Sequence, residues 1–153
     1  MNLTVRDATI DDAPTLADFN VRLVDETEDY SIEPAVALRG VTRALEADRG
    51  LRYFVADVDG RPAGMAMFTH EWSDWRDGDI WWLGSVYVDP AHRGRGVFRA
   101  LSDHVAALAE ADPDVRLLRL YVETHNEAAR ATYERLGFKE CEYRVYERPV
   151  GRA

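Results

Sequence analysis

The stretch Val86–Leu101 reads Val-Tyr-Val-Asp-Pro-Ala-His-Arg-Gly-Arg-Gly-Val-Phe-Arg-Ala-Leu and joins a predicted strand to a predicted helix. The strand is Trp81–Val88, an apolar run rich in aromatic and β-branched residues that has the length of a buried strand. Asp89-Pro90 ends it, because proline has no N–H group for a strand ladder. From Val97 apolar residues recur at helical spacing, so a helix follows the turn directly.

The turn itself, Arg93-Gly94-Arg95-Gly96, favours the binding of an anion. Its two glycines permit a tight turn and let a ligand approach the backbone closely. The first amides of the helix have no partner inside the helix, and the positive end of the helix dipole attracts anionic oxygens. A pyrophosphate group would suit this turn. A Gly-x-Gly pair alone does not show that the turn binds a phosphate, so a glycine turn that only joins the strand to the helix is the alternative interpretation.

Two sets of residues lead to a family resemblance. Arg93-Gly94-Arg95-Gly96-Val97 resembles the Arg-x-x-Gly-x-Gly/Ala signature of the GNAT superfamily of acyl-CoA-dependent N-acyltransferases. Downstream residues resemble the second signature of that family: Leu120-Tyr121-Val122, Asn126, Ala129, Tyr133 and Leu136-Gly137-Phe138. The resemblance extends over nearly the whole chain. Phe98 departs from the pattern, because the family usually has Gly or Ala at that position.

The resemblance implies acetyl-CoA as co-substrate, with its pantetheine arm lying along the central strand like an added β-partner. A backbone amide near Val86–Val88 would then polarise the acyl carbonyl. The implied cofactor-binding residues are Val86, Tyr87, Val88, Arg93, Gly94, Arg95, Gly96, Val97, Phe98, Arg99 and Asn126. Asn126 also suits the N-cap of a helix, where asparagine is strongly preferred, and the two roles are compatible.

Two catalytic roles remain to be assigned, a proton donor and a base. The resemblance implies that Tyr133 protonates the departing thiolate, and the alternative is an ordinary core tyrosine. Many relatives carry a carboxylate on the central strand where this chain has Gly84 and Ser85. By location the substitutes are Glu71, Glu123, His125 or a water chain, and we select Glu71.

Carboxylates and tryptophans before the central strand indicate where an acceptor amine would bind. Trp72 and Trp75 accompany Glu71, and aromatic faces together with carboxylates favour a cation. Glu26 and Glu28 end the first predicted helix, which in the resembling family covers the acceptor side. Core packing of the tryptophans and plain solvation of an acidic helix end are the alternatives.

The remaining elements predict one α/β domain over residues 1–153. Strands are expected at Leu3–Arg6, Arg52–Asp57, Ala63–Thr69, Val115–Val122 and Glu140–Glu147, with a long connection at His70–Asp79. Helices are expected after Asp11 as N-cap, from Pro34 to Gly50, after Val97 and at Asn126–Leu136. This pattern predicts a GNAT-like fold, a mixed, mostly antiparallel twisted sheet of about six or seven strands flanked by about four helices.

Composition excludes some classes of partner. The net charge of −9 opposes nucleic-acid binding, and no stretch has the length of a membrane span. The N-terminus lacks the apolar core of a signal peptide and Cys141 is the only cysteine, so a cytoplasmic protein is expected. The four histidines show no metal-ligand spacing, so we assign no metal. A homodimer is compatible with the sequence.

The sequence therefore predicts an N-acetyltransferase that moves an acetyl group from acetyl-CoA to a primary amine by direct attack in a ternary complex. The expected acceptor is a small cationic amine, because carboxylates are abundant in this acidic chain. The alternatives are a catalytically impaired CoA-binding module, acetylation of a protein or peptide amine, and an unrelated phosphate-binding α/β protein.

Overall fold

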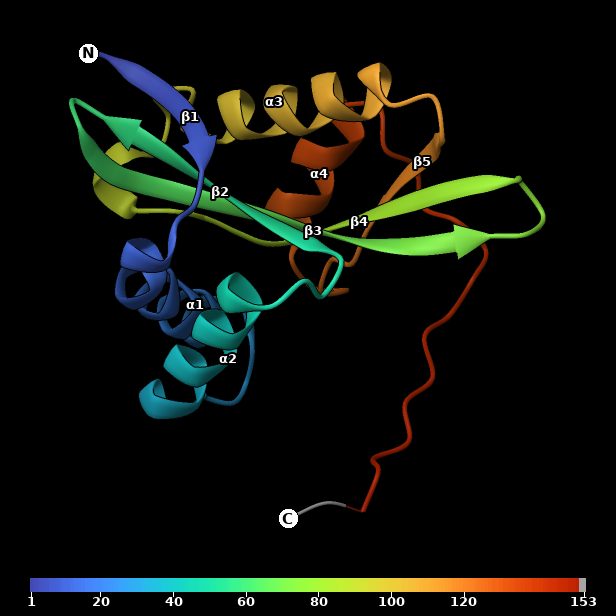
Figure 1. Cartoon of the computed structure of the whole chain (residues 1–153), viewed down its shortest axis with the longest axis horizontal. Helices are drawn as coiled ribbons and strands as arrows, with labels where there is room; N and C mark the ends of the chain where they lie inside the picture. The colour runs from blue at the N-terminus through green and yellow to red at the C-terminus, as the bar shows by residue number, and fades with distance from the viewer. Residues whose placement is uncertain (152–153) are drawn as a thin grey trace. The chain divides into compact units, whose positions relative to one another are not determined.

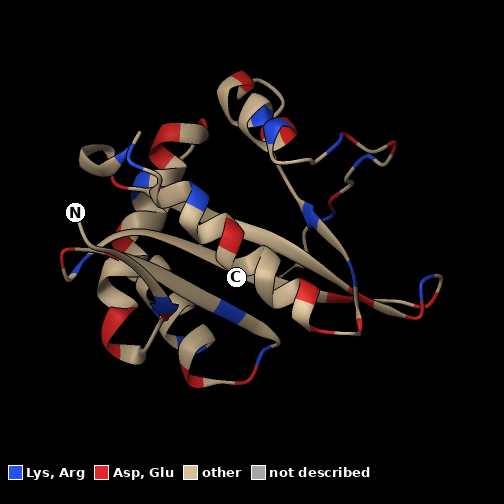
Figure 2. Ribbon diagram, turned by 90° about the horizontal axis from the view of Figure 1, so that it is seen from above, with Lys and Arg blue, Asp and Glu red and all other residues tan. Residues whose placement is uncertain are grey.

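The computed structural model describes residues 1–151, which fall into two compact units. The first unit is Met1–Glu123 and the second begins at Thr124. Within residues 1–151 no helix combines the length and the apolar character needed to cross a membrane. Figure 2 shows acidic and basic segments interspersed along the ribbon, so the negative charge is not concentrated on one element.

The first unit is built on a five-stranded sheet with the strand order β1-β2-β3-β4-β5 (Figure 1). The strands are β1 (Leu3–Asp7), β2 (Leu51–Val58), β3 (Arg61–Ser73), β4 (Gly78–Val88) and β5 (Val115–Leu120). Neighbouring strands are antiparallel except β4 and β5, which run parallel. A parallel pair needs a crossover connection, and the helix that follows the glycine turn supplies it.

Helices cover both faces of this sheet. The first unit contains α1 (Ala13–Thr27), α2 (Pro34–Glu46) and α3 (Val97–Ala111), with the short 3-10 turns η1 (Ile10–Asp12) and η2 (Pro90–His92). The second unit contains α4 (Glu127–Arg135). Asp12 rather than Asp11 is the N-cap of α1, because the 3-10 turn delays the start of the helix. The mixed, mostly antiparallel sheet and the four α-helices agree with the prediction.

Side chains that alternate along the strands divide the core into two layers. Phe54 of β2 points to one face and packs with Phe68, Trp81 and α3, whereas Val55 points to the other face. On that second face Met65 packs with residues of α1 and α2. The sheet is therefore buried on both faces near its centre, which explains why its strands read as nearly continuous apolar runs.

The predicted six or seven strands were wrong, because the sheet has five and Glu140–Glu147 forms no strand. That segment has the alternating pattern of a strand, but a strand also needs a neighbour whose backbone accepts and donates its hydrogen bonds. In the described chain it is exposed throughout and drawn as coil (Figure 1). The pattern alone could not reveal whether a neighbour is present.

The predicted connection at His70–Asp79 was also wrong, because most of it extends β3 and β4 into a long hairpin. Its tip is held by Arg116, whose side chain donates hydrogen bonds to the carbonyl oxygens of Asp77 at 2.8 Å and of Pro113. The backbone amide of Asp79 also donates to the carbonyl of Asp114 at 2.7 Å. These contacts fix the first half of β4 against β5.

Candidate functional site

The second half of β4 has an open edge. Parallel pairing with β5 runs from Asp79 to Leu83 and then stops, at the end of β5. Within residues 1–151, the strand that pairs with Gly84–Val88 is β3 alone. No strand of the described chain pairs with the other edge of this half, and an extended ligand could supply a partner there.

A bulge distorts the backbone at the start of this open half. Tyr87 pairs with Met65 and Gly84 pairs with Met67, so β4 contains one more residue than β3 between the two pairs. Ser85 lies inside the bulge with a φ of 46°, in the left-handed region that is strained for a serine. Bulges re-aim backbone groups and are frequent beside active sites.

The glycine turn forms an open cradle at the N-terminus of α3. Gly94 and Gly96 have φ values of 73° and 84°, and an added Cβ at either position would meet no atom within 4 Å. The space over the turn is therefore open, and a side chain there would intrude into it. The first amides of α3 have no partner inside the helix, and the open space beside the turn could accommodate a phosphate group.

A close approach between β3 and α3 fixes the cradle to the sheet. A Cβ on Gly64 would lie 2.9 Å from the carbonyl oxygen of Tyr87 and 3.0 Å from the Cγ1 of Val97. Only glycine leaves room for both. The start of α3 is thereby held directly over the open half of β4.

The three arginines near the cradle have different roles. Arg93 folds back onto the end of β4, donating from Nε to the carbonyl oxygen of Val88 at 2.9 Å and pairing with Glu26 Oε2 at 2.7 Å, and about half of its side chain stays exposed. Arg95 and Arg99 are exposed, and Arg99 lies 3.7 Å from Asp103. We infer that Arg93 shapes the turn, whereas Arg95 and Arg99 are the cations presented to solvent.

Helix α1 is tied to the cradle by a polar network. The Tyr87 hydroxyl donates to Glu26 Oε1 at 3.4 Å, and Arg22 pairs with Asp89 at 3.0 Å. Burial raises the pKa of the Tyr87 phenol. The pKa of Asp89 is lowered, mainly because its carboxylate accepts a hydrogen bond from the Ala91 amide and also one from Arg22. Glu26, predicted to contact an acceptor amine, is thus already engaged by the cradle.

Glu71 lies on a sheet face together with an aromatic pair. Its carboxylate is 3.4 Å from Arg119, and the Arg119 guanidinium lies 5.7 Å from the centre of the Trp82 ring. Trp82 stacks on Tyr121 with ring centres 4.4 Å apart. The side chain of Glu71 is half exposed, so the ion pair with Arg119 leaves part of it accessible to solvent.

Trp72 and Trp75, which were predicted to accompany Glu71, lie away from its carboxylate. Trp72 follows Glu71 in β3 and therefore points to the opposite face of the sheet, and it is 60% exposed. Trp75 lies in the hairpin turn and is 81% exposed. Trp81 belongs to the core on the α3 side. Glu28 is the exposed C-cap of α1.

In the second unit, α4 carries the other two predicted site residues. The Asn126 side chain accepts a hydrogen bond from the Ala129 amide at 3.1 Å, so the N-cap role is confirmed. Tyr133 is half-buried and packs edge-on against Phe138, with ring centres 5.8 Å apart. Burial raises the pKa of its phenol, which keeps it protonated at neutral pH.

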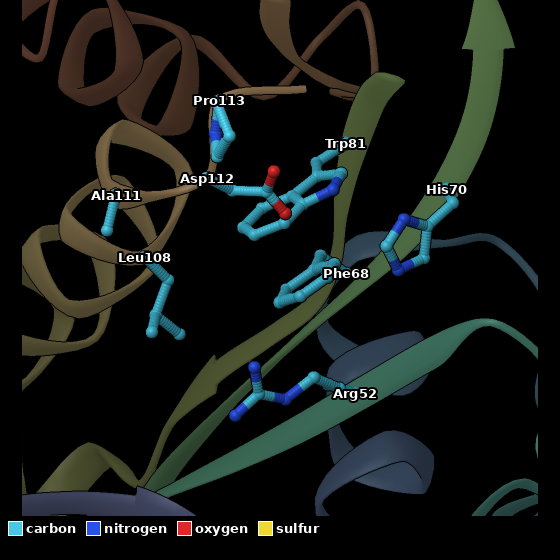
Figure 3. A pocket seen from close by; sticks show the side chains of 8 residues that line it. All are labelled: Arg52, Phe68, His70, Trp81, Leu108, Ala111, Asp112 and Pro113. Atoms are coloured by element: carbon cyan, nitrogen blue, oxygen red, sulfur yellow. The ribbon is translucent and has the colours of Figure 1, made fainter. Parts of the chain in front are cut away.

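A pocket of about 530 Å³ lies at the other end of α3 (Figure 3). It is lined by Arg52, Phe68, His70, Trp81, Leu108, Ala111, Asp112 and Pro113. Arg52 is paired with Asp7 at 2.8 Å, and His70 lies 3.6 Å from Asp79, so both basic groups already have acidic neighbours. The start and end of α3 are about 22 Å apart, which separates this pocket from the cradle.

Sequence reasoning missed several residues that shape the site. No local signal reveals the bulge at Ser85 or the ion pair of Arg22 with Asp89, because both depend on elements distant in sequence. Gly64 could have been singled out as a glycine inside a strand, a position that often marks a close approach. Within residues 1–151 no group of three or more His, Cys, Asp or Glu residues is arranged to hold a metal ion.

Comparison with known proteins places this geometry in a family. The model of the acetyltransferase (GNAT) family matches residues 16–138. The structure of a possible acetyltransferase from Clostridium difficile 630 is 39% identical, with a TM-score of 0.90, and the match covers 98% of this chain and 99% of that one. A predicted acetyltransferase from Clostridium acetobutylicum, solved with acetyl-CoA, is 18% identical with a TM-score of 0.78 and 96% coverage of both chains, which supports the fold alone.

Curated relatives match over shorter regions. A mycothiol acetyltransferase from Gordonia bronchialis is 46% identical over 77 residues, which are 45% of this chain and 23% of that protein. The chain spans less than half the length of the curated relatives it matches.

Proposed function

This chain belongs to the acetyltransferase (GNAT) family, and from that premise we propose that it transfers an acetyl group from acetyl-CoA to a primary amine. The observation that carries the proposal is that two features suited to binding a ligand, a free strand edge and a glycine turn, follow one another along the chain. The open edge of β4, from Gly84 to Val88, runs directly into the glycine cradle at the start of α3. The edge offers backbone partners to the pantetheine arm, and the cradle offers amides and two exposed arginines to the phosphates.

The proposed reaction is a direct transfer within a ternary complex. The amine nitrogen attacks the carbonyl carbon of the thioester, the new C–N bond forms, and the C–S bond breaks. One proton leaves the nitrogen for a base, and one proton is delivered to the thiolate. A backbone amide in Val86–Val88 supplies the hydrogen bond that stabilises the developing oxyanion, in the way that preorganised donors do in acyl transfer.

Tyr133 is the proposed proton donor. A raised phenol pKa keeps the proton on the side chain at neutral pH, which is the form that a donor requires. The ring packs against Phe138, so removal of the hydroxyl alone would leave the packing of α4 nearly intact.

The proposed base is Glu71, in place of the strand carboxylate that the family resemblance implies where this chain has Gly84 and Ser85. Its half-exposed carboxylate shares an ion pair with Arg119, and an ammonium group that approached it would compete with that guanidinium. The missing strand carboxylate also supports a second candidate function, a CoA-binding module with impaired turnover.

The proposed acceptor is a small amine that is cationic at neutral pH. The chain has a net charge of −9, and the exposed Tyr121 ring, which stacks on Trp82 beside Glu71, offers an aromatic face to a cation. Cation–π contact contributes about 0.5–2 kcal/mol, depending on desolvation. A protein or peptide amine is the alternative acceptor.

A thiol-release assay with cationic, neutral and acidic amines at two ionic strengths tests the acceptor. We expect cationic amines to give the highest kcat/KM, and we expect salt to lower it. Glu71→Gln should lower kcat/KM for cationic amines, whereas Glu110→Gln, on the exposed face of α3, should not. Best turnover of neutral or acidic amines would refute the cationic acceptor.

Two further measurements separate the enzyme from the impaired module. Tyr133→Phe should lower kcat by roughly 10- to 1,000-fold with unchanged affinity for CoA in calorimetry, whereas Tyr146→Phe should be silent. Tight CoA binding with no thiol release from any amine would identify the impaired module.

A further inference from the structure

The pocket at the C-terminal end of α3 lies outside the proposed acetyl-transfer site and has the size of a small-molecule site (Figure 3). Its volume of about 530 Å³ falls within the range of about 300–1,000 Å³ that such sites occupy. All of its lining residues, from Arg52 to Pro113, belong to the first unit. The cradle, at the start of α3, is about 22 Å away.

Apolar side chains form much of the surface of this pocket. On the sheet side, Phe68 and Trp81 are buried and stack with ring centres 4.0 Å apart. Leu108 packs against the same core from α3, and Ala111 lies one turn further along the helix. Burial of apolar ligand groups against these side chains is favourable. The pocket therefore favours a ligand with an apolar body.

Arg52 supplies a cation at one end of the pocket. Its Nε and Nη2 atoms donate to Asp7 Oδ1 at 3.2 Å and 2.8 Å. Its Nη1 atom has no hydrogen-bond partner within residues 1–151, and the guanidinium carbon lies 6.0 Å from the centre of the Phe68 ring. A guanidinium carries five N–H donors. Arg52 can therefore bind a carboxylate while it stays paired with Asp7.

Asp112 supplies an anion at the other end. It is the C-cap of α3, and its Oδ1 atom accepts a hydrogen bond from the Asp114 amide at 2.9 Å. Among the described residues its Oδ2 atom has no hydrogen-bond partner. The negative end of the α3 dipole lies at the same place, so the carboxylate and the helix end both attract a positively charged group.

The spacing of these two charged groups limits the length of a ligand. Arg52 lies on β2, Phe68 on β3 and Trp81 on β4, which are neighbours in the sheet. Figure 3 shows Asp112 beside Trp81 and Arg52 on the far side of Phe68. Adjacent strands are about 4.8 Å apart, so the pocket crosses about 10 Å. The charges of a free α-amino acid are too close together, whereas two or three extended residues of about 3.5 Å each match this distance.

We propose that this pocket binds a short peptide of two or three residues with apolar side chains and free ends. The peptide carboxylate contacts Arg52, its ammonium group contacts Asp112, and its side chains pack between Phe68 and Leu108. Each charge of such a zwitterion meets an opposite charge, whereas a simple anion is repelled by Asp112 and a simple cation by Arg52. This inference goes beyond acetyl transfer and does not depend on it.

Calorimetry on the full chain with dileucine and its two capped forms tests the proposal. N-acetyl-dileucine lacks the ammonium group, and dileucine amide lacks the carboxylate. Each should bind at least about 10-fold more weakly than dileucine, because each has lost one charge-assisted contact. Dileucine should bind equally well with saturating CoA present, because the cradle lies at the opposite end of α3.

Two variants identify which residue contacts which end of the peptide. Asp112→Asn should weaken dileucine binding about 10-fold and leave N-acetyl-dileucine unchanged, whereas Arg52→Gln should weaken dileucine similarly and leave the amide unchanged. Asp112→Asn keeps the side-chain oxygen that accepts from the Asp114 amide. Asp114→Asn and Arg61→Gln, at exposed positions outside the pocket, are the matched controls and should bind dileucine normally.

Circular dichroism confirms that the four variants fold. Absence of dileucine binding at millimolar concentration would overturn the proposal, as would a capped form that binds as tightly as dileucine. Unchanged dileucine affinity in Asp112→Asn or in Arg52→Gln would overturn it too. Loss of dileucine binding with saturating CoA would place the peptide at the cofactor site instead of this pocket.

Discussion

The two halves of β4 belong to one strand but have opposite roles. The first half, from Asp79 to Leu83, pairs with β3 and β5 and buries Trp81 against Phe68, with ring centres 4.0 Å apart. The second half, from Gly84 to Val88, pairs with β3 alone and contains the bulge at Ser85. The first half anchors the fold. The second half keeps one edge available for a ligand, because β3 and α1 hold it in place without occupying that edge.

The same contrast appears in the polar contacts. The first half is fixed by backbone bonds to the loop before β5, where Asp79 donates to the carbonyl of Asp114. The second half is fixed by side chains of α1, through Glu26 to Tyr87 and, just beyond its end, through Arg22 to Asp89 and Glu26 to Arg93. Side-chain contacts with a helix leave the backbone groups at the strand edge free, whereas pairing with a neighbouring strand uses those groups. Substitutions in each half should therefore separate stability from ligand affinity.

The largest effect is expected for Trp81→Ala in the first half. Removing a core ring that is 4% exposed should lower the free energy of unfolding by about 3–5 kcal/mol, because it leaves a cavity beside Phe68. Chemical denaturation measures this change. Trp75→Ala, at a position that is 81% exposed, should change it by less than about 0.5 kcal/mol. A small loss for Trp81→Ala would show that the first half is not the anchor.

Gly96→Val tests the second half. A side chain there enters the open space over the cradle, so affinity for CoA in calorimetry should fall at least about 100-fold, or about 2.7 kcal/mol. Gly60→Val is the matched control, because Gly60 has a similar φ of 80° and equally open surroundings in the β2–β3 turn. Both variants share the backbone strain, but only Gly96→Val should lose CoA binding. Equal affinities would place the phosphates elsewhere.

A smaller effect, dependent on pH, is expected for Asp89→Asn at the end of the second half. The pKa of Asp89 is lowered in the folded protein, so its carboxylate stabilises the fold above the unfolded pKa of about 3.9. That contribution is lost as the pH falls through the folded pKa. The variant should lose about 1 kcal/mol at neutral pH and show a shallower decline in stability below about pH 4.

Denaturation curves at several pH values measure this difference. Asp103→Asn is the control, because Asp103 is largely exposed and lies 3.7 Å from Arg99. Parallel pH curves for Asp89→Asn and the unmodified protein would show that Asp89 does not support the cradle.

The smallest effect is expected for Ser85→Gly in the bulge. Glycine at this position relieves the left-handed backbone strain of Ser85, which should stabilise the folded state by about 1–2 kcal/mol. The greater conformational freedom of glycine in the unfolded chain should offset about 0.5–1 kcal/mol of that gain. The net result should be a slight rise in the melting temperature. Ser102→Gly in α3 should instead lower it, because glycine is a poor helix former. A lower melting temperature for Ser85→Gly would show that Ser85 stabilises the bulge through its side chain.

The sequence by itself determined the strand, the glycine turn and the helix of Val86–Leu101. Their signals are local, since proline ends a strand, glycine adopts positive φ, and apolar residues at helical spacing bury one face. The N-cap role of Asn126 is local in the same way. The resemblance to a family of acyltransferases depended on these same residues, and the family match agrees with it.

Only the tertiary structure decided where the pairing of β4 with β5 ends, which arginine is held by α1, and that Glu140–Glu147 forms no strand. Each of these depends on a partner far away in sequence: β5 for Leu83, Glu26 for Arg93, and a strand edge for Glu140–Glu147. A residue pattern indicates which secondary structure a segment can form when a suitable neighbour is present. Whether that neighbour is present is settled by long-range packing and hydrogen bonding, which the local pattern does not encode.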